Sequence, residues 1–447
     1  MSLKLGNTTV GSLYLGSTKI GAAYLGNVKV YESINYNPLN LPPLTVRAKW
    51  APDYTPTVGA TNTIVDATEN IWDSTMSDGN WRQKFASTFR TNLLEVIGAN
   101  TSSVTDMRQC FQNCTNLTSV GPMDLSGCTQ YGPTSMFIGC SKLVSVGNLK
   151  TTGIPSTSSM FSGCTLLTSI SLFDTSSVTN ASGMFYSCKA LSSVPFFDTG
   201  AVTNFGTSNS NSMFSKCTSL TTFPAFNVSS ATSLSNMFYG CSALTTVPSN
   251  WDVSTIQDFS VMFSGCSNLV NVPTLNTSSA TNMASMFFGC SSLVTAPNLT
   301  TTSVTSMNTM FYGCSALKNV PLYSTSSVTS MEGTFGNCSS LESLPLFDTS
   351  HVTRFFSSNR GAGLCKGCTS LKSIPLLDTG SATQVSLMFS GCTNVESGAL
   401  ALYQQMSTQT TPPTGHTDTF SNCGSDTVTG AAELSQIPSD WGGTMSA

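Results

Sequence analysis

A short phrase, Met-Phe-x-x-Cys, recurs through most of the chain and limits the folds that it can adopt. With the cysteine as register mark, twelve copies can be aligned. The steps between them are mostly 24 residues, with 25 or 26 twice and 29 or 30 twice. A fixed period of this size is typical of a solenoid, in which each repeat forms one rung and packs on its neighbours. The twelve marks are Cys114, Cys140, Cys164, Cys188, Cys217, Cys241, Cys266, Cys290, Cys314, Cys338, Cys368 and Cys392.

Columns of the aligned copies indicate how one rung folds. The positions three, six and nine residues after the cysteine are nearly always apolar, as in Leu191, Val194 and Phe197, so they should point inward. A proline that often follows the second of these suits the trailing end of a short strand, where a missing N–H costs little. The Asp, Asn or Ser in the next column can accept hydrogen bonds from turn N–H groups. The predicted fold class is a leucine-rich-repeat solenoid with rungs of about 24 residues. Each rung should hold one short parallel β-strand and a short helical turn on its back.

A second repeat, of period ten, occupies residues 1–33 and has the form Leu-Gly-x-x-x-Val. Gly followed by Asn or Ser between runs of apolar and β-branched residues predicts strands joined by tight turns. Three strands of about seven residues make too small a core to stand alone. We therefore expect a small β-rich module for attachment or oligomerisation, whose contacts would be made by Leu5, Val10, Leu15, Ile20, Leu25 and Val30.

The rest of the chain divides around the solenoid. Residues 34–79 are proline-rich and predict a linker and lead-in, with one strand at 45–50. The solenoid itself is assigned to residues 80–395. Its first repeat, 80–104, has the polar substitutions of a cap, and residues 81–86 predict a helix. Residues 396–447 predict a C-terminal cap with helices near 397–406 and 431–437.

Composition excludes several classes of partner. Only 9% of the residues are charged and the net charge is −4, with no basic run, so nucleic acid and anionic membranes are not expected partners. No apolar stretch approaches the ~18 residues of a membrane span, so membrane insertion is not expected either. The N-terminus does not resemble a signal peptide. We expect a protein that is made in a reducing cytoplasm and leaves the cell, if at all, by lysis.

Enzymatic or metal chemistry has little support in the sequence. Cys365 and Cys368, like Cys110 and Cys114, could be read as halves of a zinc site, which needs four N or S ligands. In each pair, however, the extra cysteine occupies a Met or Phe column, which favours packing as a small hydrophobe. Distance allows disulfides between rungs, but a reducing compartment disfavours them. The two histidines, His351 and His416, belong to no nucleophile-base set. We therefore predict no enzyme, and no catalytic, metal or cofactor-binding residues.

The full phrase, Met-Phe-x-Gly-Cys-x-x-Leu-x-x-Val-Pro-x-x-Asp-Thr-Ser-Ser-Val, resembles the BspA-like leucine-rich repeats of bacterial surface proteins. That class occurs in adhesins and in tailed-phage proteins, and the resemblance covers about residues 81–395. The leader repeats and residues 399–405 resemble predicted virion proteins of phages that infect gut Bacteroides. The resemblance implies a ligand-binding fibre or adhesin without enzymatic activity. It supplies no fixed binding residues.

Two groups of residues are candidate ligand contacts. In the column before the inward aromatic, Phe196, Leu322 and Leu346 differ from residues such as Thr274 while neighbouring columns stay constant. This variation could reflect ligand recognition, or only a relaxed packing requirement at a half-buried position. The second group lies in an insert of a weakly charged chain, and two aromatics and two cations there suit a contact loop. Alternatively, its phenylalanines pack back onto the solenoid. This group is Arg354, Phe355, Phe356 and Arg360.

These features favour a phage virion protein, a tail or head fibre, made in the host cytoplasm and released by lysis. It would bind other virion proteins through residues 1–33 and a host surface glycan or protein through the solenoid. A homo-oligomer, with a trimer as the guess from fibres in general, is expected. The alternatives are an adhesin on a bacterial cell surface and a purely structural head or neck fibre that binds no receptor.

Overall fold

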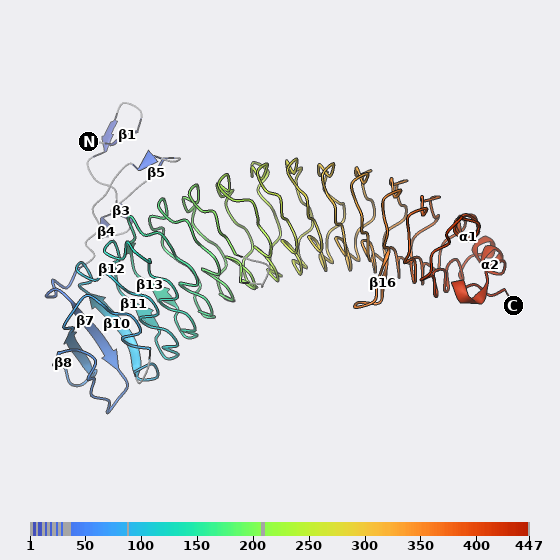
Figure 1. Ribbon diagram of the computed structural model, residues 1–447. Helices are drawn as coiled ribbons and strands as arrows, with labels where there is room; N and C mark the ends of the chain where they lie inside the picture. The colour runs from blue at the N-terminus through green and yellow to red at the C-terminus, as the bar shows by residue number, and fades with distance from the viewer. Residues whose placement is uncertain are drawn as a thin grey trace. The chain divides into compact units, whose positions relative to one another are not determined.

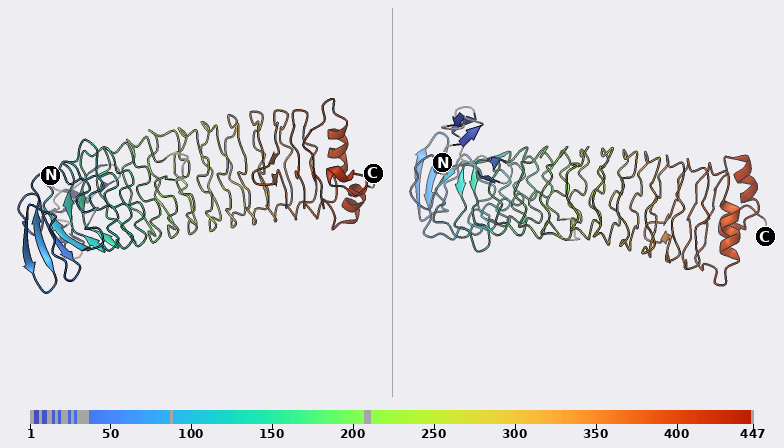
Figure 2. Two further views of the ribbon diagram at one scale, coloured as in Figure 1. Left: turned by 60° about the horizontal axis from the view of Figure 1, so that its bottom comes forward. Right: turned by 90° about the horizontal axis from the view of Figure 1, so that it is seen from above.

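The computed structural model describes residues 37–86, 89–206 and 211–445, and the backbone of six short strands between residues 3 and 29. It comprises two compact units. Unit 1 consists of Met1–Asn180 with Val194–Ala201, and unit 2 of Ala181–Ser193 with Val202–Ala447. The ribbon in Figure 1 runs from blue to red along the chain, and Figure 2 gives two further views.

The leader folds into strand pairs rather than single strands. Its antiparallel pairs are β1 (Leu3–Leu5) with β2 (Thr8–Val10), β3 (Tyr14–Leu15) with β4 (Thr18–Lys19), and β5 (Tyr24–Leu25) with β6 (Val28–Lys29). The prediction of one seven-residue strand per unit is therefore wrong. Gly-Asn and Gly-Ser lie between paired strands in the sequence, and these are dipeptides that favour tight hairpins. Among the predicted attachment residues, Ile20 and Val30 lie outside the described residues. Leu5, Val10, Leu15 and Leu25 fall in the strands, and whether any of the six contacts a partner stays a prediction.

Unit 1 opens with a sheet where a linker was expected. Its strands are β7 (Thr45–Trp50), β8 (Thr61–Asp66), β9 (Ile71–Thr75), β10 (Leu93–Ala99), β11 (Ser119–Val120) and β13 (Ser145–Val146), in the order β13-β11-β10-β7-β9-β8. The strand predicted at 45–50 is confirmed, and it lies inside the sheet. Antiparallel partners flank it on both sides, β10 on one and β9 on the other. Because β10 pairs in parallel with β11, this sheet joins the first rungs without a break.

Aromatic side chains fill the space behind this sheet. Trp50, Trp81 and Phe85 are fully buried, and the Phe85 ring stacks 4.9 Å from that of Phe111 in the next rung. The helix predicted at residues 81–86 does not form. Alternate backbone N–H groups bond to the next rung instead, as in Phe85 N–H to the Cys110 carbonyl at 2.9 Å, and the others close tight turns within the segment, as in Lys84 N–H to the Trp81 carbonyl at 3.1 Å.

Short parallel strands form in two rungs where the column that usually holds proline holds glycine. Gly121 and Gly147 donate their N–H groups to Val96 and Val120 of the preceding rung, each at 2.7 Å. Next to them, β12 (Met123–Asp124) pairs in parallel with β14 (Leu149–Lys150). In the described rungs of unit 2 that carry proline in this column, this donor is absent and the parallel pairing is reduced to single bridges such as Leu275 with Leu299. The leucine-rich-repeat solenoid is confirmed, although the described residues between β14 and β15 form isolated bridges and not the predicted strand in each rung.

On the back of each rung, the Met-Phe segment forms tight turns. In the rung of Cys266, Cys266 N–H bonds to the Phe263 carbonyl at 3.0 Å, which closes one turn, and Phe263 N–H bonds to Met286 of the next rung at 2.9 Å. The residue before the cysteine has a positive φ, 77° at Gly265, a conformation that glycine adopts without strain.

Cysteine and phenylalanine build the core of both units. All sixteen cysteines lie in the described part of the chain; they are buried and none forms a disulfide. The Phe rings stack from rung to rung, with Phe263 5.7 Å from Phe238 and 5.8 Å from Phe287. Thiols of the cysteine column donate to a carbonyl of the preceding rung, as in Cys290 Sγ to Phe263 O at 3.1 Å. The cysteine column therefore satisfies a buried acceptor as well as filling space.

The polar turn column behaves as predicted. Asp174 in unit 1 accepts from Ser176 N–H at 3.0 Å, and Asp252 and Asp348 in unit 2 do the same for Ser254 and Ser350 at 3.0 and 3.1 Å. A side-chain acceptor within the turn explains why Asp and Asn recur in this column.

Unit 2 ends in a helical cap, shown at the red end of Figure 2. It consists of α1 (Ala399–Ser407), α2 (Val428–Leu434) and the short 3-10 helix η1 (Ser439–Trp441). The second helix begins three residues earlier than predicted, because the Thr427 side chain caps it by accepting from Gly430 N–H. The carboxylate of Glu433 accepts from Gly398 and Leu400 at the start of α1, which ties the two helices together.

Candidate functional site

Three leucines form a continuous apolar row on the surface of unit 2. Leu322, Leu346 and Leu376 are 69%, 63% and 56% exposed, and they occupy the same column of successive rungs. We call them the leucine stripe. The next residue of each rung turns inward, so the buried side chains of Tyr323, Phe347 and Leu377 lie directly after the stripe in sequence. The stripe is thus the outward side of a segment whose inward side is fixed by the core.

Charges of alternating sign accompany the stripe four residues earlier in each rung. These residues, Lys318, Glu342 and Lys372, are exposed. Their backbones are hydrogen-bonded from rung to rung, from Glu342 N–H to the Lys318 carbonyl and from Lys372 N–H to the Glu342 carbonyl. An apolar row beside mixed charges matches the centre and rim of a protein interface. Among the predicted contact residues, Leu322 and Leu346 thus lie together. Phe196 is 47% exposed in the equivalent column of unit 1.

The insert of unit 2 is a hairpin, and it includes fewer residues than the sequence indicated. Its strands are β15 (Phe356–Ser357) and β16 (Ala362–Gly363). Phe355 is fully buried and unavailable to a surface ligand, so its assignment as a contact is wrong and the alternative, that it packs onto the solenoid, holds for this residue. It occupies the inward column that holds Met283, Met307 and Met331 in earlier rungs, and this alignment could have identified it from the sequence.

The other three insert residues are at least partly accessible. Arg354 is exposed and its Nε pairs with Glu332 at 2.5 Å, and Phe356 is half-buried in β15. Arg360 lies beyond β15, with its guanidinium carbon 4.8 Å from the centre of the Phe288 ring. Arg360 forms no salt bridge with any residue in the described ranges, so its charge is available to a ligand.

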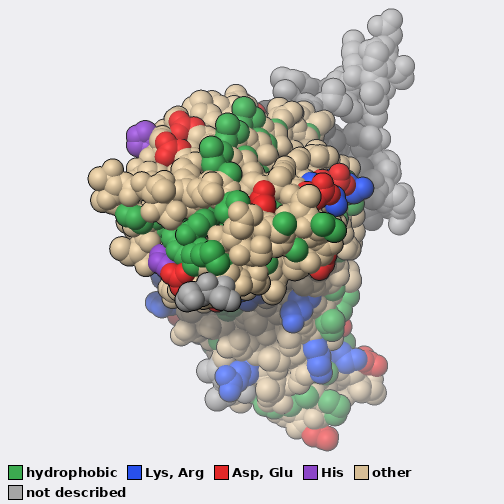
Figure 3. Space-filling model, turned by 90° about the vertical axis from the view of Figure 1, so that its right-hand side faces the viewer, with side chains coloured by type: hydrophobic (Ala, Val, Ile, Leu, Met, Phe, Trp, Pro, Cys, Tyr) green, Lys and Arg blue, Asp and Glu red, His purple; other side chains and the backbone are tan. Residues whose placement is uncertain are grey.

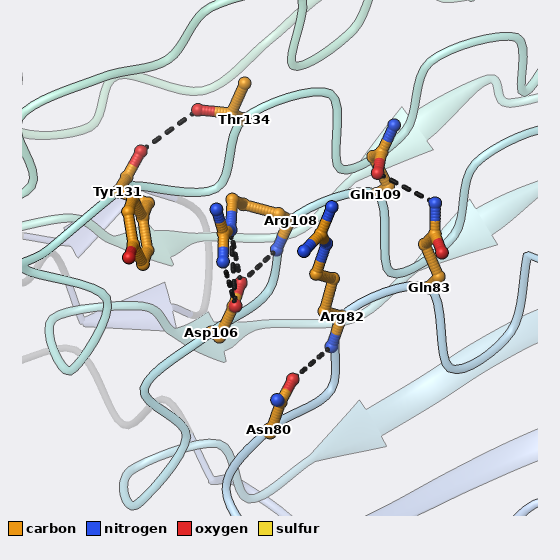
Figure 4. Close-up of polar contacts among 8 residues, drawn as sticks. All are labelled: Asn80, Arg82, Gln83, Asp106, Arg108, Gln109, Tyr131 and Thr134. Carbon is orange, nitrogen blue, oxygen red and sulfur yellow. Dashed lines mark hydrogen bonds and ion pairs between the residues drawn. The ribbon is translucent and has the colours of Figure 1, made fainter.

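A polar cluster in unit 1 was missed by the sequence analysis (Figure 4). Arg82 and Arg108 occupy the same column of two neighbouring rungs, and beside them Gln83 donates to Gln109 at 2.9 Å. The Arg108 guanidinium donates two hydrogen bonds to the Asp106 carboxylate, from Nε to Oδ1 at 3.0 Å and from Nη2 to Oδ2 at 2.6 Å. The spacing of 26 residues between the arginines, one rung, was the available signal.

The electrostatics of this cluster distinguish its two arginines. Burial would raise the pKa of Asp106, but the hydrogen bonds from Arg108 outweigh it and lower that pKa below its usual value. The Arg108 guanidinium is thereby engaged by Asp106. Its carbon atom also lies over the Tyr131 ring, 3.6 Å from the ring centre. The exposed Arg82 forms no salt bridge within the described part of the chain, so it is the cation of the cluster that can receive an anionic group.

A hollow of about 510 Å³ lies on the sheet of unit 1, next to Tyr54, Ile64 and Trp72. Two of its polar side chains are engaged within the protein: Lys49 pairs with Glu69, and Asn70 bonds to the carbonyls of Ala51 and Tyr54. Burial raises the pKa of Tyr54. The Lys49 and Asn70 side chains are therefore not free to bind a ligand in this hollow.

The buried thiols and the histidines do not assemble a reactive centre in the described residues. Burial raises the pKa of Cys365 well above its ordinary value, and thiols held protonated are poor nucleophiles. His351 contacts only Ser350 at 3.1 Å on the surface, and His416 stacks 4.3 Å from Trp441 in the cap. No group of three or more His, Cys, Asp or Glu within the described ranges could hold a metal ion. No helix there is long and apolar enough to cross a membrane.

The C-terminal end of unit 2 is also a poor candidate for a charged partner. Figure 3 shows this end with few, scattered Asp, Glu, Lys and Arg side chains among uncharged atoms. Val428, at the start of α2, is among its exposed apolar residues.

Comparison with known proteins places the repeats in one family. The model described as "Mycoplasma protein of unknown function, DUF285" matches residues 80–193, 132–222, 208–322 and 295–403. No curated protein matches the chain. Among solved structures, a leucine-rich-repeat protein of Bacteroides ovatus has 20% identity over 77% of this chain and 93% of that one, with a TM-score of 0.40. One of Eubacterium ventriosum has 16% identity over 79% and 91%, also with a TM-score of 0.40. The leucine-rich-repeat protein of T. pallidum has 17% identity over 52% and 79%, with a TM-score of 0.23.

Proposed function

This chain belongs to the DUF285 family, and we propose that it is a non-enzymatic repeat protein that binds a protein on a host surface through the leucine stripe. The observation that carries the proposal is the exposure of Leu322, Leu346 and Leu376 in successive rungs. Fully burying one leucine contributes about 1.5–3 kcal/mol, so covering the three exposed portions would supply roughly 3–5 kcal/mol. That is enough for the centre of a specific interface when polar contacts surround it.

A protein partner suits this stripe better than a glycan. Leucine offers no hydrogen-bonding group and no flat aromatic face, which are the features that hold sugar rings. The alternating charges of Lys318, Glu342 and Lys372 instead match the mixed polar rim of a protein interface.

We further propose that the chain acts as a phage fibre, in which the leader hairpins attach it to other virion proteins as a homo-oligomer, with three copies as the working number. Three repeated strand pairs are too small to form an independent core, which supports a role in docking or self-association. The three structures named above come from bacteria, so the virion assignment depends on the leader and on the sequence resemblance. An adhesin on a bacterial surface and a structural fibre without a receptor are the alternatives.

Replacing the leucine stripe tests the proposed binding. The full chain with Leu322→Ser, Leu346→Ser and Leu376→Ser should lose at least tenfold in affinity for host cells. The matched control is Leu166→Ser, at an exposed leucine outside the stripe. Prior protease treatment of the cells should abolish binding, and periodate treatment should leave it. Equal binding by the triple variant and the native chain would refute the stripe. Binding that survives protease but not periodate would refute the protein partner.

Deleting residues 1–33 tests the attachment separately. The truncated chain should still bind cells but fail to join particles, and light scattering should show a smaller assembly than for the full chain. Unchanged assembly size and unchanged incorporation would exclude the leader as the attachment module.

A further inference from the structure

Unit 2 has a second surface feature, formed by other columns of the repeat than the leucine stripe. Most of its residues lie two or five positions before the cysteine of their rung. It is a cleft of about 290 Å³, at the lower end of the range for small-molecule sites. We call it the aromatic cleft. It is lined by Asn236, Tyr239, Val261, Ser264, Ser285, Phe288 and Arg360.

A missing aromatic ring creates this cleft. The column two residues before the cysteine holds Tyr239, Ser264, Phe288 and Tyr312 in successive rungs. Phe288 and Tyr312 stack at 5.2 Å with nearly parallel planes, which leaves no room between them. Ser264 is too small to fill its place in the column, so Tyr239 and Phe288 are separated by a gap of two rungs, roughly 10 Å at the usual strand spacing.

The walls of the cleft are held firmly. The Phe288 ring is backed by Tyr312, whose hydroxyl accepts from Asn337 at 2.8 Å. The backbone of Asn236, Val261 and Ser285 has positive φ in each rung, 60°, 61° and 57°. Such a conformation is unusual for a β-branched residue like Val261 and persists only where the surrounding structure imposes it. A rigid, preformed wall reduces the entropy lost when a ligand binds.

Two hydroxyl groups in the cleft lack hydrogen-bond partners among the described residues, whereas that of Ser285 bonds to the Thr309 hydroxyl at 2.7 Å. Neither the Tyr239 hydroxyl nor the Ser264 hydroxyl has a hydrogen-bond partner among the described residues, and Asn236 uses only its amide N–H, which donates to Ser235. Arg360 extends its guanidinium over Phe288 and has no ion pair in the same ranges. No Asp or Glu lines the cleft, so it is locally positive in a chain whose net charge is −4.

We propose that the aromatic cleft binds a sugar residue that carries a carboxylate, as found in acidic polysaccharides. The C–H face of a pyranose ring can pack on the flat face of Tyr239, and one ring suits the gap left by Ser264 between Tyr239 and the Arg360 guanidinium that covers Phe288. The free hydroxyls and the Asn236 carbonyl oxygen are placed for sugar hydroxyls, and the guanidinium of Arg360 is a planar, bidentate partner for a carboxylate. This inference goes beyond the proposed function, because it uses other residues and another class of ligand.

Binding of short oligogalacturonates to the full chain, measured by calorimetry and by saturation-transfer NMR, tests this site. The native chain should bind them with a Kd in the millimolar range or below, and neutral oligogalactosides at least tenfold more weakly. Arg360→Gln should lose about tenfold in affinity for the acidic sugar only. Ser264→Tyr should abolish binding of both sugars, because it completes the aromatic column as Tyr312 does one rung beyond Phe288. Arg354→Gln, at the insert arginine that pairs with Glu332, is the matched control and should bind as the native chain does.

The outcomes separate this site from the leucine stripe. If Ser264→Tyr keeps its thermal unfolding midpoint and loses the sugar while its cell binding persists, the cleft is an independent sugar site. Native-like sugar binding by both Ser264→Tyr and Arg360→Gln, or no binding of oligogalacturonate by the native chain, would overturn the proposal. Equal affinity for neutral and acidic sugars would overturn the role of Arg360. Loss of cell binding in the triple leucine variant bears only on the stripe.

Discussion

The cysteine ladder should make unit 2 unstable at alkaline pH. Burial raises the pKa of nine of its thiols, to about 12 for Cys241 and Cys423, whereas a thiol in an unfolded chain titrates near ~8.5. Above that pH the unfolded chain binds fewer protons than the folded one, so the free energy of unfolding falls as pH rises. More than about one pH unit below it, both states are protonated and the thiols contribute almost no pH dependence. The nine are Cys217, Cys241, Cys266, Cys290, Cys314, Cys338, Cys365, Cys392 and Cys423.

The expected loss is large because the effect repeats in every rung. At pH ~9.5, one unit above the unfolded pKa, each thiol costs about 1.4 kcal/mol. If unit 2 unfolds as a whole, nine thiols remove about 13 kcal/mol, which is comparable to the total stability of many domains. If only three rungs open together, the loss for that segment is still about 4 kcal/mol.

Urea unfolding under a phosphine reductant, followed by circular dichroism at pH 7.5, 8.5 and 9.5, would measure this loss. If unit 2 unfolds as a whole, the free energy of unfolding should fall by about 3 kcal/mol between pH 7.5 and 8.5 and by about 9 kcal/mol between pH 8.5 and 9.5, and the urea midpoint should fall with it. Cys290→Ser is the matched control, because a hydroxyl can keep the hydrogen bond to Phe263 O but does not titrate in this range. Its pH dependence should be weaker by about one proton. A native midpoint at pH 9.5 equal to that at pH 7.5 would refute the reasoning, since it would mean that the thiols ionise equally in both states.

Three substitutions test other parts of the repeat, each by the shift in its thermal unfolding midpoint. Gly147→Ala should destabilise unit 1 by about 2–4 kcal/mol, since the new Cβ would lie 2.7 Å from the backbone nitrogen of Pro122; a loss below ~0.5 kcal/mol would contradict the close approach. Gly313→Asn should cost under ~1 kcal/mol and Gly313→Val clearly more, because the site has room but a φ of 76°; equal costs would show that φ is not the limit. Glu433→Ala should cost about 1 kcal/mol through the lost cap of α1, and faster hydrogen exchange at Leu400 should accompany it.

The solenoid could be predicted because its information is repeated in every rung. Any one copy of Met-Phe-x-x-Cys is a weak signal, but twelve aligned copies separate inward columns from outward ones, and the stacked Phe rings and buried cysteines match that division. The column of the leucine stripe emerged from the same comparison.

The features that were missed occur only once in the chain. The strands β8 and β9 lie between prolines and glycines in a segment without a repeat, and four of the six residues of β8 are exposed, so no alternating apolar pattern marks it. The arginine cluster joins residues 26 positions apart across a rung whose cysteine is replaced by Arg90. Phe355 was misassigned because the insert was taken to begin at Arg354, two residues too early, which moved an inward residue into a loop.

The division between constant and variable columns also explains where function can reside. A residue in the cysteine column must be small and largely apolar, and it must donate to the Phe carbonyl one rung before; Cys290 does all three at 3.1 Å. Alanine lacks the donor, and serine adds a hydroxyl that is costly to bury. The outward columns carry no such requirement: the position of Leu346 holds Thr274 in another rung, and that of Phe288 holds Ser264. Substitutions there change the surface of one rung without disturbing the ladder beneath it. Both proposed sites, the leucine stripe and the aromatic cleft, therefore arise at positions where the repeat is free to vary.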